Sequence, residues 1–192
     1  SVEKVLLGPE RKSHMMNPRE KEITAYHEAG HAIVGHYMLH SHPIHKVTVV
    51  PRGAGGGFTW SLPVEDRHLS SVQDFKDDLA MMLGGRMAEK LIFNEITTGA
   101  SNDLQNATNL ARRMVMDFGM SDQLPNQVFG SQRDAIFLGR ELGEGKNYSD
   151  QVAKVIDDEV ARLIDEASSR AFEMVKKNRT QLRQVAEFLV KE

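Results

Sequence analysis

The spacing of apolar side chains along the chain predicts five helices. In residues 18–39, apolar and small side chains recur every three or four positions, as on one face of a helix. A start signal precedes them, because Asn17 suits the N-cap, Pro18 the first helical position and Glu20 the capping box. The same periodicity predicts further helices over residues 71–93, 101–119, 149–177 and after residue 178. Phe118, in the third of these helices, is expected to face the core.

One stretch between the first two helices has strand-like chemistry. Residues 45–52 are rich in β-branched side chains, residues 53–57 form a glycine-rich turn, and residues 58–60 resume the strand-like pattern. Residues 1–16 lack clear periodicity, so they are expected to be a linker into the first helix. The sequence therefore predicts a mainly α fold with a small β-hairpin beside the first helix, in one domain over residues 17–192.

Two consecutive glycines, Gly84 and Gly85, stand in the interior of the second predicted helix. A glycine at such a position costs up to about 1 kcal/mol relative to alanine, so the pair needs a reason. Either a neighbouring helix approaches closely at these glycines, or the helix has an ordinary kink there.

The composition narrows the classes of function. The chain has 192 residues, 40% of them apolar, which suits one globular domain. Its net charge of −3 and the lack of a long basic run argue against binding of nucleic acid. The chain contains no cysteine, so a transition metal would need nitrogen and oxygen ligands. No stretch approaches the roughly 18–20 consecutive apolar residues that span a bilayer, and the chain as given is expected to be soluble.

The sequence His27-Glu28-Ala29-Gly30-His31 lies inside the first predicted helix. Two imidazoles four residues apart meet on one helix face and can hold a single metal ion. Glu28 lies about 100° around the helix from His27, so its carboxylate can reach a metal-bound water without occupying a coordination position. The motif therefore predicts a zinc peptidase in which Glu28 is the general base.

A catalytic zinc takes three protein ligands and keeps one position for water, so the two histidines need a partner. The pattern with a third histidine six residues after the second does not apply, because Tyr37 occupies that position. A carboxylate from a later helix remains, with Glu89 and Asp103 as candidates. An exposed glutamate in a helix such as that of Glu89 is usually solvated. Asp103 follows the turn at residues 97–100 and begins a helix whose amides favour a carboxylate. The spacing leaves both residues open.

Four motifs follow one another along the chain. They are AYHEAGHA at residues 25–32, HKVTVVPRG at 45–53, LGGR at 83–86 and TTGASNDL at 97–104. In this order they resemble the peptidase domain of the FtsH family of membrane-anchored AAA+ proteases, and the likeness spans nearly the whole chain. The resemblance implies that His27, His31 and Asp103 bind one zinc ion per chain and that Glu28 is the catalytic base.

The resemblance also implies properties of a longer protein. Residues 8–13 are similar to the family's junction between ATPase and peptidase, so residues 1–16 are expected to be the linker from a preceding ATPase module. Family members form homo-hexamers that degrade unfolded or membrane proteins delivered by that module, which alone would bind ATP. Their N-terminal transmembrane helices place them in the bacterial inner membrane, with the peptidase on the cytoplasmic side, or in an organellar membrane.

An exposed edge strand after the glycine-rich turn could pair with an extended peptide through its backbone. The candidate substrate-binding residues are Gly56, Gly57, Phe58, Thr59 and Trp60. Alternatively, the hairpin serves packing only. A non-enzymatic alternative for the whole chain is a helical oligomerisation module that holds a structural metal or none. A second histidine cluster near the end of the first helix is expected to face solvent; its members are His40, His42 and His45.

Overall fold

The computed structural model describes residues 16–50, 57–61, 69–129 and 148–191. Within these ranges the chain forms five α-helices, one short 3-10 helix and a two-stranded sheet. In chain order the elements are α2 (Pro18–Tyr37), β1 (Ile44–Thr48), β2 (Phe58–Ser61), α3 (Val72–Phe93), η1 (Thr98–Ala100), α4 (Ser101–Met116), α5 (Asp150–Lys177) and α6 (Arg179–Lys191). The predicted mainly α fold with a small hairpin is confirmed.

Local capping explains where the first two helices begin. At the start of α2, the Glu20 N–H donates to Asn17 Oδ1 over 2.8 Å, and the Asn17 N–H donates back to the Glu20 carboxylate. Ser71 and Asp74 form the same reciprocal pair at the start of α3, which ends at Asn94 in a left-handed conformation. α2 therefore begins where its start signal predicts, and α3 begins within one residue of the start expected from periodicity.

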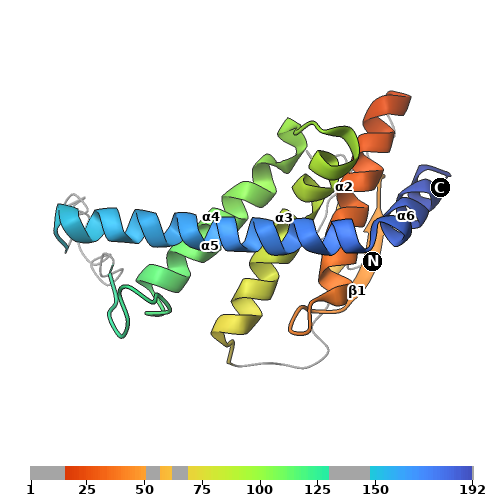
Figure 1. The fold of residues 1–192 in the computed structure, drawn as a ribbon. Coiled ribbons are helices and arrows are strands. Elements are labelled where there is room, and N and C mark those ends of the chain that lie inside the picture. The colour runs from red at the N-terminus through yellow and green to blue at the C-terminus, as the bar shows by residue number, and fades with distance from the viewer. Residues whose placement is uncertain (1–15, 51–56, 62–68, 130–147, 192) are drawn as a thin grey trace, which may run out of the picture.

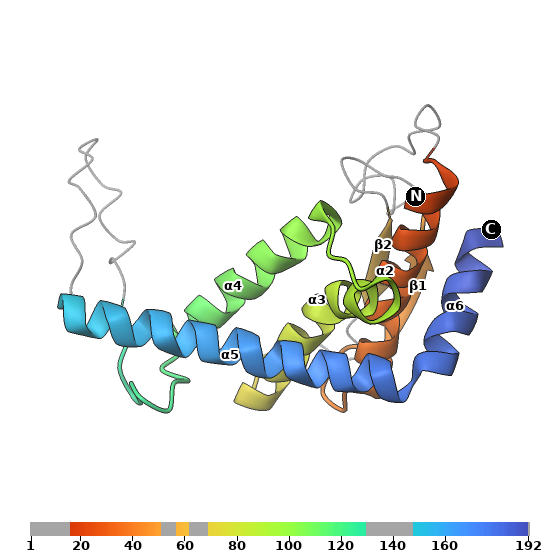
Figure 2. The ribbon, with the colours of Figure 1, turned by 45° about the horizontal axis from the view of Figure 1, so that its top comes forward.

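The longest helix, α5, crosses the others and closes one side of the core (Figure 1). It packs across α3 and α4, while α2 and α3 pack against each other. After Asn178 the chain turns, and α6 packs back along α2 (Figure 2). Each of the five described α-helices contributes large, fully buried side chains: Val34, Leu79, Leu83, Met114, Val115, Leu163, Val175 and Leu182. The burial of these side chains fixes α2, α3 and α4 relative to one another.

The backbones of α2 and α3 touch where they cross. A Cβ atom at Gly84 would lie 2.7 Å from the backbone oxygen of Gly30, a distance that only a backbone shift could relieve. α3 continues unbroken through this point. Close approach of a neighbouring helix, rather than a kink, therefore explains Gly84.

The two strands form an antiparallel hairpin that lies against α2. Val47 pairs with Thr59 and Thr48 with Phe58, and the register shifts between Ile44 and Lys46. The hairpin thus brings the start of β2 next to the helix that carries the paired histidines.

One core assignment from the sequence is wrong. Phe118 is 40% exposed, because α4 ends at Met116 and no longer directs the next turn inward. Its ring instead stacks on Phe75, with 5.4 Å between the ring centroids.

Among the described residues, no helix combines the length and apolarity needed to cross a bilayer.

Candidate metal centre

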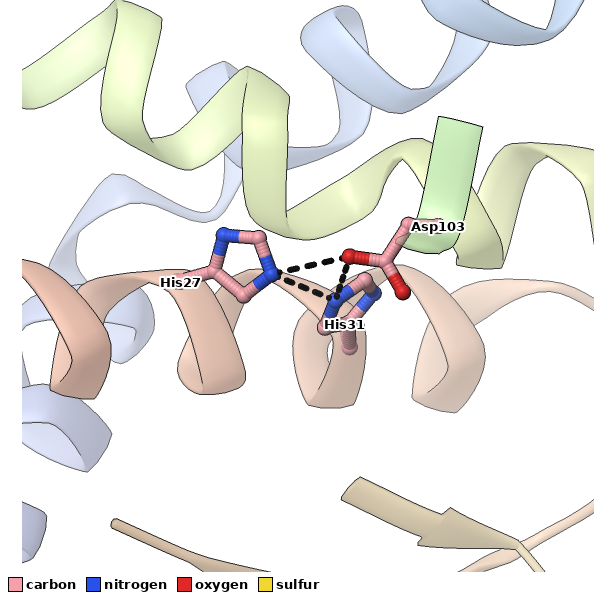
Figure 3. A group of neighbouring side chains, drawn as sticks. All are labelled: His27, His31 and Asp103. Carbon is pink, nitrogen blue, oxygen red and sulfur yellow. Dashed lines mark hydrogen bonds and ion pairs between the residues drawn. The ribbon is translucent and has the colours of Figure 1, made fainter. Parts of the chain in front are cut away.

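Three side chains from two helices converge on one point (Figure 3). His27 and His31 lie one turn apart on α2, and Asp103 lies in the first turn of α4. Asp103 Oδ2 is 3.1 Å from His27 Nε2 and 3.5 Å from His31 Nε2, and the two Nε2 atoms are 3.0 Å apart. Both histidines are nearly buried, whereas a quarter of the Asp103 side chain is exposed. The centre is therefore buried on the α2 side and partly open to solvent at Asp103.

These three atoms fit a metal ion. Tetrahedral zinc with bonds of about 2.0–2.2 Å holds its nitrogen and oxygen ligands roughly 3.3–3.6 Å apart. The observed separations of 3.0, 3.1 and 3.5 Å lie close to that value. Two histidines and one carboxylate also form a donor set of catalytic zinc sites, which keep a fourth position for water. In the described part of the chain, this is the one group of histidine and acidic side chains compact enough to hold an ion.

The other nitrogen of each imidazole is occupied by α3. His27 Nδ1–H donates to Glu89 Oε1 over 2.7 Å, and His31 Nδ1–H donates to the backbone oxygen of Met81 over 2.8 Å. Glu89 Oε2 in turn accepts a hydrogen bond from the Thr97 N–H. Such bonds fix the tautomer of a metal-binding histidine and leave Nε2 free for the ion.

The two candidate carboxylates thus occupy different sides of His27. Asp103 faces Nε2, beside His31, whereas Glu89 faces Nδ1 and does not belong to the compact group. Glu89 is only 1% exposed, so the expectation of a solvated glutamate is wrong. Both carboxylates contact the same imidazole, and the spacing of residues in the sequence does not indicate which ring nitrogen each one contacts.

Without a metal, a proton on His27 offsets negative charge of the carboxylates around it. Burial lowers the pKa of His27, but hydrogen bonds to Asp103 and Glu89 outweigh burial and raise it to about 9. Burial also opposes the charged form of Asp103, yet hydrogen bonds from His27 and His31 hold the pKa of that carboxyl well below its usual range. Without a metal, His27 therefore carries a proton at neutral pH, which a bound cation would displace.

The carboxylate of Glu28 lies in the same cavity and is held by β2. Glu28 is 6% exposed and accepts a hydrogen bond of 2.7 Å from the Thr59 hydroxyl. Burial raises the pKa of Glu28 above its ordinary value, although His31 and the Thr59 bond oppose the change. A raised pKa suits a carboxylate that takes up and releases a proton during a reaction.

The cavity measures about 430 Å³ and joins the metal-facing atoms to the strand. Three candidate substrate-binding residues, Gly57, Phe58 and Thr59, line it beside the histidines. Gly56 and the side chain of Trp60 lie outside the described residues. Over Phe58–Ser61, β2 pairs with β1 along one edge, and the described sheet contains no strand on the other edge.

The second histidine cluster does not assemble into a comparable site. His40 is exposed, and its Nδ1 lies 3.6 Å from a carboxylate oxygen of Asp74 at the start of α3. The described residues place neither His42 nor His45 in a compact group of metal ligands. These three histidines therefore add no second metal centre to the part of the chain described.

Comparison with known proteins identifies the family. The sequence profile of peptidase family M41 matches residues 14–192. The ATP-dependent zinc metalloprotease FtsH of Kosmotoga olearia is 51% identical over 191 residues, which cover 99% of this chain and 30% of that protein. The ATP-dependent zinc metalloprotease FtsH 1 of Sphaerobacter thermophilus is 49% identical over 190 residues, which cover 99% of this chain and 29% of that protein. The ATP-dependent zinc metalloprotease FtsH 3 of Petrotoga mobilis is 46% identical over 192 residues, which cover 100% of this chain and 30% of that protein. The chain spans less than a third of the length of these relatives. With most of its length matched by the family profile, the chain belongs to peptidase family M41.

Proposed function

We propose that this chain is a zinc-dependent endopeptidase domain that hydrolyses peptide bonds at the His27, His31 and Asp103 centre. The observation that carries the proposal is that the buried carboxylate of Glu28 lies in the same cavity as the three side chains that could bind a metal ion. The relatives named above are zinc metalloproteases, which agrees with this chemistry.

Each side chain of the centre would have a separate task. His27, His31 and Asp103 would hold the zinc ion. The bound ion would lower the pKa of a water molecule and polarise a peptide carbonyl. Glu28 accepts the proton of the attacking water, keeps it in the buried cavity and delivers it to the leaving amine nitrogen. The Thr59 hydroxyl orients Oε2 of Glu28 during both transfers. Catalysis therefore depends on α2 for the ligands and the base, and on β2 for the orientation of the base.

The whole protein would be larger than this chain. We infer that residues 17–192 form the peptidase domain and that residues 1–16 link it to an AAA+ ATPase module, because the relatives are described as ATP-dependent and extend well beyond the matched region. That module would bind ATP and deliver unfolded or membrane proteins. The whole protein would form homo-hexamers anchored in the bacterial inner membrane, with this domain on the cytoplasmic side.

A metal-specific diffraction experiment tests the site. Crystals grown with zinc, measured on both sides of the zinc absorption edge, should give one peak about 2.0–2.2 Å from His27, His31 and Asp103, with water as the fourth ligand. Chelation should end cleavage of an unfolded model protein, and added zinc should restore it. A peak bound by Glu89 instead of Asp103 would overturn the ligand assignment. A site closed by four protein ligands would favour a structural module.

We propose further that β2 binds substrate by backbone pairing along the edge that faces away from β1, beside Glu28. Gly57 and Phe58 line the cavity there, Trp60 belongs to β2, and Gly56 precedes these residues in the sequence. The side chains of the substrate would then matter less for binding than its backbone, so cleavage would tolerate many substrate sequences.

The variant Thr59→Pro is expected to raise KM for peptide cleavage about tenfold or more, because proline removes a backbone N–H and distorts an edge strand. Its zinc content should stay at one ion per chain. Thr59→Val is the matched control, since it loses the same hydroxyl but keeps the N–H. Steady-state kinetics with one peptide compares them, and equal KM values for the two variants would contradict backbone pairing.

A further inference from the structure

We propose that Gly85 of α3 is a positioning residue of the metal centre, because its missing side chain provides the space in which the His27 imidazole lies. The proposal deepens the proposed function and rests on it in one respect, the assignment of His27 as a metal ligand. The contact itself is a property of the metal-free fold.

The geometry leaves no room for a side chain at residue 85. A Cβ atom at Gly85 would lie 2.6 Å from His27 Nε2 and 2.7 Å from both Cδ2 and Cε1. Ordinary contacts between such atoms are about 3.5–4.0 Å. Three ring atoms at nearly equal distances place the Gly85 backbone against the face of the imidazole, at the nitrogen that faces Asp103.

The imidazole has little freedom to move away from such a Cβ. Its Nδ1 is bound to Glu89 Oε1 at 2.7 Å, and Glu89 is fixed by the Thr97 N–H at 2.8 Å. The His31 ring lies edge-on to it, with 4.7 Å between the ring centroids. His27 as a whole is 8% exposed. A methyl group at residue 85 would therefore break the Glu89 bond or push Nε2 out of the metal position.

Gly85 belongs to a row of residues on α3 that faces both histidines. Met81, Gly85 and Glu89 are spaced four apart and so share one helix face. Met81 offers its backbone oxygen to His31, and Glu89 offers its carboxylate to His27. This face of α3 sets the orientation of both rings, and Gly85 keeps it open.

The two adjacent glycines therefore have separate roles. Gly84 meets the backbone of Gly30 and sets how closely α2 and α3 approach. Gly85 meets a side chain, that of His27, and sets where one ligand atom lies. Gly35, on α2, gives a contrast, because the atoms nearest to a Cβ there belong to flexible side chains, with Ile44 Cδ1 at 2.9 Å and Met81 Sδ and Cγ at 3.0 and 3.3 Å.

Zinc affinity is the first test. Gly85→Ala in the 192-residue chain should lower the affinity for zinc about 10- to 100-fold, the usual range when the groups that orient a ligand are disturbed. Competition with a fluorescent chelator measures this value. The matched control is Gly35→Ala, also a buried helical glycine, which should keep zinc affinity and peptide cleavage within about twofold. Unchanged zinc affinity in Gly85→Ala would overturn the proposal.

A double-mutant cycle on the metal-free protein isolates the contact. Gly85→Ala should lower the melting temperature by several degrees when His27 is present. In the His27→Ala background the colliding ring is gone, so the same change should be neutral or stabilising, because alanine favours a helix over glycine. If Gly85→Ala does not fold, recovery of folding in the double variant supports the proposal. An equal loss in both backgrounds, or failure of both to fold, overturns it. Lack of zinc binding by the wild type would instead refute the proposed function alone.

Discussion

Glu28→Gln is expected to abolish peptide cleavage while the chain keeps its zinc. Glutamine has nearly the same shape, and its amide oxygen can still accept the Thr59 hydrogen bond, so the cavity should not change. It cannot take a proton from water, and loss of a general base costs about 10²–10⁴-fold in rate. Cleavage of an unfolded model protein gives the rate, and atomic absorption gives the zinc content.

Glu95→Gln provides the matched control for this variant. Glu95 is exposed, lies after the end of α3 and does not line the cavity, so its substitution should leave cleavage unchanged. The melting temperatures of both variants should stay close to that of the wild type when zinc is present. Cleavage by Glu28→Gln at the rate of Glu95→Gln would exclude Glu28 as the base.

The helices could be predicted because their signals are local. The reciprocal bonds of Asn17 with Glu20 occur as the sequence predicts, and the structure shows the same arrangement between Ser71 and Asp74, which are also three residues apart. Phe118 shows the limit of the same reasoning. Its spacing suited a buried helix face, but α4 ends two residues before it, and nothing in the periodicity marks that end.

The paired histidines were likewise accessible from sequence, since two residues four apart on one helix share a face whatever the rest of the fold does. The spacing of residues did not identify the third partner, and Asp103 was expected only from the family resemblance. Asp103 lies 76 residues after His27 and Glu89 lies 62 residues after it, so their positions depend on how α3 and α4 pack against α2. Both carboxylates reach the imidazole, and only the three-dimensional structure distinguishes the nitrogen that each one faces.

The glycine pair lies between these two cases. The sequence marked Gly84 and Gly85 as costly in a helix and therefore in need of a reason, but it could not assign a partner to either glycine. The structure gives them different partners, a backbone for Gly84 and an imidazole for Gly85. A single motif thus combines a packing contact with a contact at the metal centre.

Asp103→Asn is expected to lower zinc affinity more than about 100-fold, beyond the range typical of groups that only orient a ligand. The substitution keeps the size of the side chain but replaces a charged oxygen donor by a neutral one. It also removes the negative charge that faces both Nε2 atoms. Chelator competition at one fixed pH measures the change, since protons compete with zinc for His27.

Glu89→Gln separates a ligand from the partner of a ligand. Because Glu89 bonds to Nδ1 of His27, its substitution should weaken zinc binding only about 10- to 100-fold, less than Asp103→Asn does. The order of the two effects therefore decides between the two carboxylates that residue spacing left open. A larger loss in Glu89→Gln would make Glu89 the third ligand and would require the first turn of α4 to move away from the histidines when zinc binds. Such a movement would also break the contacts of Asp103 with His27 and His31, which the metal-free geometry makes at 3.1 and 3.5 Å.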